Sequence, residues 1–189
     1  MEEIAVIVLA ADGRLINGVP VQLSLHDGRP LLEHIIARVV GWGAAASAVV
    51  LGAHAERILD EVDLDSVDAI INPEWREGTA SSLRVGLDAL LRTHPQSSAA
   101  LLVPGDVADV DIDLVTEMVD RYRVDRPQAV VPKYRYEWGP PVLVDSSVWA
   151  RLMSLEGEAN ALELLKAHPS WVVETWFDAQ VPRSVGTVA

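Results

Sequence analysis

The stretch that decides the fold is IAVIVLAADGR, residues 4–14. The unbroken apolar run from Ile4 to Ala10 is rich in β-branched side chains and predicts a strand buried on both faces. A polar, glycine-containing loop follows, and a helical pattern of apolar residues then begins at Leu31. A buried strand, a long loop and a helix are the opening unit of a parallel α/β fold.

The same alternation of strand and helix continues along the chain. Further strands are predicted at residues 48–51, 69–71, 99–103, 129–131, 142–144 and 171–175, and helical patterns occur at 31–40, 54–61, 83–91, 111–122, 147–155 and 159–167. We therefore expect an α/β protein with a Rossmann-like three-layer α/β/α architecture and a mostly parallel central sheet, formed as one domain over residues 1–189.

The composition narrows the range of partners. The 189 residues carry a formal net charge of −13 and include no cysteine, which disfavours nucleic acid and excludes disulfides and thiolate metal sites. No apolar run approaches the roughly 20 residues of a membrane helix, and the start Met1-Glu2-Glu3 lacks the basic region of a signal peptide. We expect a cytoplasmic protein that binds small molecules rather than nucleic acid or membrane; the sequence does not indicate an oligomeric state.

Candidate binding residues follow the predicted strands, because ligands of parallel sheets bind beyond the carboxyl ends of the strands. Ala10 and Ala11 would let a base or phosphate approach the backbone, although small residues would equally end a tightly packed strand. Ser81 and Ser82 lie in the first turn of a helix, where hydroxyls cap the helix or bind an anion. Asp106 is our candidate ligand for Mg²⁺, the alternative being a solvated turn residue.

The histidines show no ligand-like spacing to one another, and we expect them to be structural or exposed. They are His26, His34, His54, His94 and His168.

Taken together, these loops resemble the MobA/MocA family of nucleotidyltransferases. That family opens on Leu-Ala-Ala-Gly-x-Ser-x-Arg-x-Gly-x-Pro-Lys-Gln-Leu-Leu, and residues 9–23 here are LAADGRLINGVPVQL. The family's Asn-Pro-x-Trp-x-x-Gly-x-x-Ser-Ser-Leu-x-x-Gly-Leu resembles NPEWREGTASSLRVGL at residues 72–87. Shorter matches are GRPLLEH at 28–34 and GPPV at 139–142, so the resemblance spans nearly the whole chain.

The resemblance implies transfer of a nucleotide from CTP or GTP to a phosphorylated acceptor such as molybdopterin, with release of pyrophosphate. By the same resemblance Asp106 would hold Mg²⁺, and Ala10-Ala11 in place of a Gly-Gly pair favours CTP over GTP. The residues expected to bind the nucleotide are Leu9, Ala10, Ala11, Ser81 and Ser82.

The first motif departs from the family at the positions where family members bind the triphosphate. Asp12 stands in place of a glycine, Ile16 in place of the signature arginine and Val21 in place of the lysine. Arg14 is our candidate replacement cation, and a late Asp-x-Asp-Thr-Pro-Glu-Asp motif with a second metal carboxylate is replaced by residues 184–187. Two hypotheses follow: a nucleotidyltransferase with an altered phosphate grip, or a member that has lost catalysis and binds a nucleotide, a pterin-like ligand or a partner protein.

Overall fold

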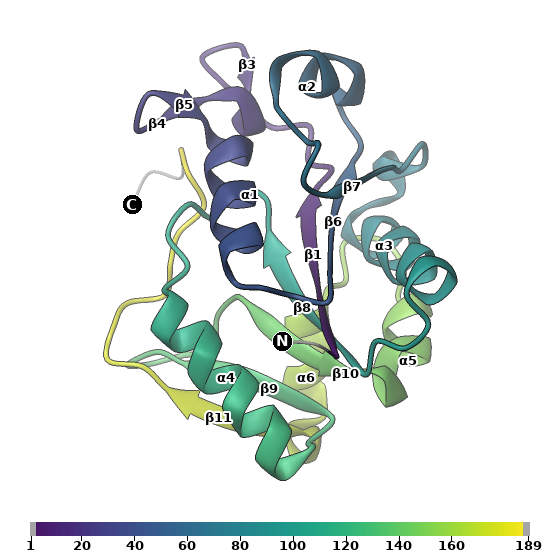
Figure 1. The fold of residues 1–189 in the computed structure, drawn as a ribbon, viewed down its shortest axis with the longest axis vertical. Coiled ribbons are helices and arrows are strands. Elements are labelled where there is room, and N and C mark those ends of the chain that lie inside the picture. Colours follow the sequence, from purple (N-terminus) through teal and green to yellow (C-terminus); the bar gives the residue numbers. More distant parts are fainter. Residues whose placement is uncertain (1–2, 187–189) are drawn as a thin grey trace.

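A seven-stranded sheet forms the centre of the computed structural model, which describes residues 3–186 (Figure 1). Its strands are β1 (Ile4–Ala10), β6 (Ala46–Leu51), β7 (Asp68–Ile71), β8 (Ala99–Pro104), β9 (Ala129–Lys133), β10 (Val142–Asp145) and β11 (Val172–Trp176). They lie in the order β11-β9-β10-β8-β1-β6-β7. Only β10 runs antiparallel to its neighbours within this sheet, so the prediction of a mostly parallel sheet is confirmed.

Helices cover both faces of the sheet. They are α1 (Leu31–Gly41), α2 (Ala55–Glu61), α3 (Thr79–Thr93), α4 (Ile112–Asp125), α5 (Trp149–Met153) and α6 (Ala161–Ala167). Figure 1 shows α1 and α4 on one side of the sheet and α3 and α5 on the other. The three-layer α/β/α architecture is thereby confirmed.

Strand β1 lies between the two hydrophobic cores because successive side chains of a strand point to opposite faces. Ile4, Val6 and Val8 pack into the core beneath α1, α2 and α4. Ala5 and Ile7 pack into the other core, beneath α3, α5 and α6. All five side chains are at most 1% exposed, so the apolar run that opens the chain forms the centre of the molecule.

The long loop between β1 and α1 contains two small hairpins, β2–β3 (Leu15–Ile16 and Val19–Pro20) and β4–β5 (Leu25–His26 and Arg29–Pro30). Their tips are Asn17-Gly18 and Asp27-Gly28, and all four residues have positive φ angles. Asn-Gly and Asp-Gly pairs favour this left-handed backbone, which matches the twist of the flanking strands. The hairpins lie in the segment that was predicted to be one long loop.

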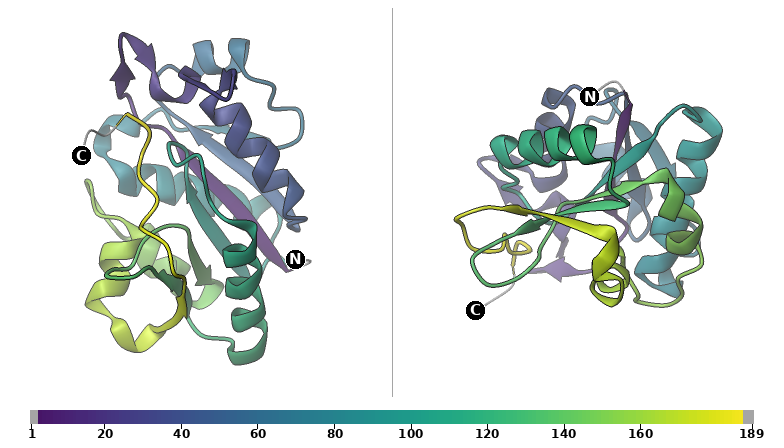
Figure 2. Two further views of the ribbon diagram at one scale, coloured as in Figure 1. Left: turned by 90° about the vertical axis from the view of Figure 1, so that its left-hand side faces the viewer. Right: turned by 90° about the horizontal axis from the view of Figure 1, so that it is seen from below.

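The C-terminal segment after β11 returns toward the N-terminal hairpins, as the yellow trace in the left panel of Figure 2 shows. The backbone N–H of Val185 donates to the carbonyl oxygen of Asp106 at 2.8 Å. This contact places the last described residues beside the loop that follows β8. Among residues 3–186, no helix is long and apolar enough to cross a membrane.

Candidate active site

A cavity of about 930 Å³ lies where β1 and β8 end. Residues 9–13 and 102–106 form one wall, and the start of α3 together with residues 158–162 forms much of the rest. Because β1 and β8 are parallel neighbours, their carboxyl ends open on the same edge of the sheet. This is the edge at which parallel α/β sheets bind ligands.

Gly105 allows the two strand ends to approach each other. A Cβ atom at this position would lie 2.5 Å from Cβ and 2.7 Å from Cα of Ala10, and 2.8 Å from the carbonyl oxygen of Leu9. The backbone N–H of Gly105 donates to that oxygen at 2.7 Å. Gly105 therefore sets how closely the backbone that carries Asp106 approaches the end of β1.

We expect Gly105→Ala to destabilise the protein by about 1–3 kcal/mol, since the new methyl group meets backbone atoms that cannot turn away. The urea midpoint of unfolding, followed by circular dichroism, measures this change. Gly41→Ala, at a helical site where the added Cβ meets no atom within 4 Å beyond its own stretch of helix, is the matched control and should be neutral or stabilising. Equal stability of Gly105→Ala and the wild type would contradict the close approach.

Gln22 holds the backbone that follows β1. Its side-chain Nε2 donates to the carbonyl oxygens of Ala10 and Asp12, both at 2.9 Å, and the residue is 1% exposed. Leu9, Ala10 and Ala11 all line the cavity, so the structure brings these three predicted residues together. Gln22 matches the glutamine of the family motif, but its role became apparent only in the structure.

Asp106 and Arg14 form an ion pair at the rim of the cavity. The Arg14 guanidinium donates from Nη2 to Oδ2 of Asp106 at 2.6 Å, and its Nε lies 3.4 Å from Oδ2 of Asp12. The Arg14 backbone N–H also donates to Oδ1 of Asp12 at 2.8 Å. Two carboxylates and one guanidinium therefore stand together, with the Arg14 and Asp106 side chains 32% and 21% exposed.

Ser81 and Ser82 lie differently, although both accept from Nδ2 of Asn72, at 2.9 and 3.0 Å. Ser82 lines the cavity. Ser81 is 1% exposed and does not line it; its hydroxyl donates to the carbonyl oxygen of Gly78 at 2.8 Å. Asn72 is fully buried and orients both hydroxyls, a role that the sequence pattern did not indicate.

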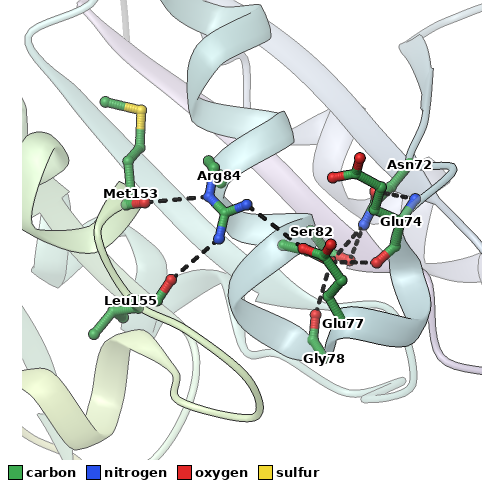
Figure 3. A network of polar contacts seen from close by, with 9 residues as sticks. Asn72, Glu74, Glu77, Gly78, Ser82, Arg84, Met153 and Leu155 are labelled. Atoms are coloured by element: carbon green, nitrogen blue, oxygen red, sulfur yellow. Dashed lines mark hydrogen bonds and ion pairs between the residues drawn. The ribbon is translucent and has the colours of Figure 1, made fainter.

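Arg84 connects α3 to the chain segment on the opposite side of the cavity. Figure 3 shows its guanidinium between Glu77 and the chain after α5. It donates to the carbonyl oxygens of Met153 and Leu155 at 3.3 and 3.2 Å, and it lies 3.8 Å from the Glu77 carboxylate. These contacts hold the start of α3 against the segment that carries residues 158–162.

The N-terminus of α3 already holds a carboxylate. Oε2 of Glu158 accepts from the backbone N–H and the hydroxyl of Thr79, at 3.3 and 3.0 Å. The positive end of a helix dipole favours such an anion. Glu158 therefore occupies the helix N-terminus at which the sequence left open either helix capping or the binding of an external anion.

The altered positions of the first motif fall into two groups. Asp12 lines the cavity. Ile16 packs against Gly186, where an added Cβ would meet Ile16 Cδ1 at 2.5 Å, and Val21 is fully buried in the core. Ile16 and Val21 thus have packing roles. Of the late segment 184–187, Ser184 lines the cavity, and Thr187 lies outside the described residues.

Tyr134 supports the cavity wall at Pro140. Its hydroxyl donates to the carbonyl oxygen of Pro140 at 2.7 Å, and Pro140 lines the cavity. Burial raises the pKa of Tyr134 above its ordinary value, which keeps the phenol protonated and able to donate.

A mostly parallel sheet between two helical layers, with a cavity at the carboxyl ends of β1 and β8, defines a Rossmann-like fold of the nucleotide-sugar transferase class. The chain belongs to the MobA-like NTP transferase domain family, whose match covers residues 6–171.

Two proteins illustrate the similarity. Nicotine blue oxidoreductase of Paenarthrobacter nicotinovorans is 26% identical over 172 residues, which cover 89% of this chain and 83% of that protein. The crystal structure of Rv0371c from Mycobacterium tuberculosis has a TM-score of 0.87 at 26% identity, covering 98% of this chain and 94% of that one. A structure of Rv0371c in complex with manganese has a TM-score of 0.85 at 24% identity, with the same coverage.

Proposed function

We propose that this chain transfers a nucleotide, CMP in preference to GMP, from a nucleoside triphosphate to a phosphorylated acceptor such as molybdopterin. The acceptor phosphate oxygen would bond to the α-phosphorus, and the bond to the β-phosphate would break to release pyrophosphate. The observation that carries the proposal is Asp106: its carboxylate stands at the cavity rim beside the ends of β1 and β8 and already binds a cationic group, the guanidinium of Arg14, at 2.6 Å.

The donor set at this rim fits Mg²⁺. Asp106 offers a carboxylate, the ligand type that Mg²⁺ prefers, and phosphate oxygens and water commonly complete its coordination. Bound there, the ion would neutralise charge on the phosphates during transfer. The manganese complex of Rv0371c supports a divalent cation in this fold.

Arg14 competes with such an ion for the Asp106 carboxylate, because both are cations. Released from Asp106, the guanidinium would lie close to the phosphate end of the cavity and could pair with phosphate oxygens bidentately. In this proposal Arg14 supplies part of the positive charge that the family arginine and lysine provide, and its side chain must move for the nucleotide to bind.

The methyl groups of Ala10 and Ala11 support the choice of a small base in this proposal. The Ala10 methyl group packs against Gly105, and the Ala11 methyl group packs against Gly52, where an added Cβ would lie 2.8 Å from it. Two glycines at positions 10 and 11 would leave more room here. The narrower floor supports the choice of cytosine over guanine, with Ser82 available to donate to the base or ribose.

We expect CTP to bind at least about tenfold more tightly than GTP, a difference of about 1.4 kcal/mol, and both to bind more tightly with Mg²⁺ than with EDTA. Isothermal titration of each nucleotide, with Mg²⁺ and with EDTA, measures this preference. Pyrophosphate release in the presence of CTP, Mg²⁺ and molybdopterin measures transfer. Equal or tighter binding of GTP would contradict the base assignment, and failure of both nucleotides to bind at millimolar concentration would contradict the proposed function.

A second candidate is a protein that binds a nucleotide or a pterin-like ligand without transferring it. The observation that favours it is the charge around the cavity, whose lining includes three carboxylates, Asp12, Asp106 and Glu158, and one basic side chain, Arg76. In addition, one relative of this chain is named as an oxidoreductase and not as a nucleotidyltransferase. Binding of CTP without pyrophosphate release, at saturating acceptor, would support this second function against the first.

A further inference from the structure

Two histidines and one aspartate meet outside the cavity. His26 lies in β4, His34 in the first turns of α1, and Asp109 in the loop between β8 and α4. One possible metal-ligand atom from each residue lies within 4.8 Å of the other two. The two imidazole rings are in edge contact, with centroids 4.6 Å apart. None of the three residues lines the cavity at the ends of β1 and β8.

His34 has an unsatisfied nitrogen at this cluster. The residue is 6% exposed, and its Nε2 is buried without a hydrogen-bond partner among the described residues. Its other nitrogen, Nδ1, lies 3.3 Å from Nη2 of Arg29. A buried polar atom without a partner costs roughly 1–3 kcal/mol, so a ligand that coordinates this imidazole would remove a real penalty.

The donor types identify the ligand. Two imidazoles and a carboxylate suit zinc and its first-row neighbours, whereas Mg²⁺ and Ca²⁺ prefer oxygen ligands alone. Three protein ligands with water in the fourth position form a common tetrahedral zinc arrangement. We propose that His26, His34 and Asp109 form a binding site for a divalent transition-metal cation of the zinc type, separate from the Asp106 site.

The cluster needs only a small contraction to reach this geometry. Metal–ligand distances of about 2.0–2.1 Å place tetrahedral ligand atoms roughly 3.3 Å apart, compared with at most 4.8 Å here. His34 is fixed by its helix. His26 belongs to a two-residue hairpin strand, and Asp109 is an exposed loop residue, so these two can move inward. The bound ion would fasten the β4–β5 hairpin to α1 and to the loop that follows Asp106.

Arg29 opposes the ion in two ways. Its guanidinium places a positive charge 3.3 Å from the His34 ring, and its hydrogen bond requires the lone pair of Nδ1. Coordination of the ion through Nδ1 would displace this hydrogen bond. Coordination through Nε2 would move the ring proton to Nδ1, and a protonated Nδ1 cannot accept a hydrogen bond from Arg29. Either way the contact is lost, so Arg29→Ala should bind the ion several-fold more tightly.

The test is titration of the purified chain with zinc chloride by calorimetry, together with the visible absorption spectrum of the Co²⁺-substituted protein. We expect one ion per chain and the intense absorption bands of tetrahedral Co²⁺. His26→Gln and Asp109→Asn, both at surface segments, should weaken binding at least 10- to 100-fold, by analogy with the losses seen when even outer-shell partners of metal ligands are removed. His34→Gln should do the same, provided that its circular dichroism spectrum shows that it folds.

Two variants serve as matched controls. His54→Gln removes an exposed histidine elsewhere, and Asp106→Asn removes the carboxylate of the proposed nucleotide site; both should bind Zn²⁺ as the wild type does. The proposal is overturned if no stoichiometric binding occurs below 1 mM Zn²⁺, or if His26→Gln and Asp109→Asn bind normally. It is also overturned if His54→Gln or Asp106→Asn weakens Zn²⁺ binding as much as His26→Gln and Asp109→Asn do. Because nucleotide is absent, these outcomes are independent of the proposed transferase function.

Discussion

Asp106→Asn should lower the rate of Mg²⁺-dependent pyrophosphate release from CTP by at least about 100-fold, because the carboxylate that would hold the ion becomes a neutral amide of the same shape. The same change frees Arg14 from its 2.6 Å ion pair. We therefore expect CTP binding measured in EDTA to be unchanged or tighter, while the gain in affinity on adding Mg²⁺ disappears. Calorimetric titration with CTP in EDTA and in Mg²⁺ measures the two affinities, and the pyrophosphate assay measures the loss of turnover.

The control for this prediction is Asp113→Asn, which removes an exposed carboxylate from the first turn of α4. It changes the net charge equally, but Asp113 does not line the cavity, so binding and turnover should remain those of the wild type. If Asp106→Asn retained the full Mg²⁺ effect on CTP affinity, Asp106 would not be the metal ligand and the proposed mechanism would be wrong.

The double change Asp12→Gly and Ile16→Arg should raise the affinity for CTP by roughly 10- to 100-fold. It removes a carboxylate from the cavity lining and restores the arginine of the family motif. Each change of one charge near a triphosphate corresponds to about 1 kcal/mol or more at the dielectric of a protein surface. Calorimetric titration with CTP and Mg²⁺, at two salt concentrations, measures the gain.

Val21 should remain unchanged in this experiment, although the family has lysine at that position. Val21 is fully buried in the hydrophobic core, and an ammonium group there would be desolvated at a cost of several kcal/mol. A matched control is Leu59→Arg with Asp60→Ala on the exposed side of α2, which gives the same change of net charge away from the cavity. An equal gain in both double variants would show a long-range charge effect, and no gain would mean that Asp12 and Ile16 do not limit triphosphate binding.

The sequence predicted the fold well because hydrophobic patterning is a local property. The apolar run Ile4–Ala10 indicated a strand buried on both faces, and the structure confirms this with β1 between two cores. The parallel sheet and the helices on both faces followed from the same periodicity. The β2–β3 and β4–β5 hairpins were not predicted, because strands of two residues are too short to show a period, although Asn17-Gly18 and Asp27-Gly28 were signals for them.

The candidate site was predicted only in part. Residues Leu9, Ala10, Ala11, Ser82 and Asp106 line one cavity, as expected for residues that follow parallel strands. Their roles in binding remain predictions. The burial of Ser81 depends on which side of the first turn of α3 faces Asn72, and the position of Glu158 depends on packing between distant segments.

The sequence by itself determined the order of strands and helices, the family, and the edge of the sheet where polar loop residues gather, since these follow from local periodicity and contiguous motifs. Only the tertiary structure decided which charges meet. Arg14 and Asp106 are 92 residues apart in sequence, and Asp109 joins His26 and His34 although the histidine spacing suggested no site. Contacts of this kind depend on how loops from separate strands pack together, and the residues within any one loop do not specify that packing.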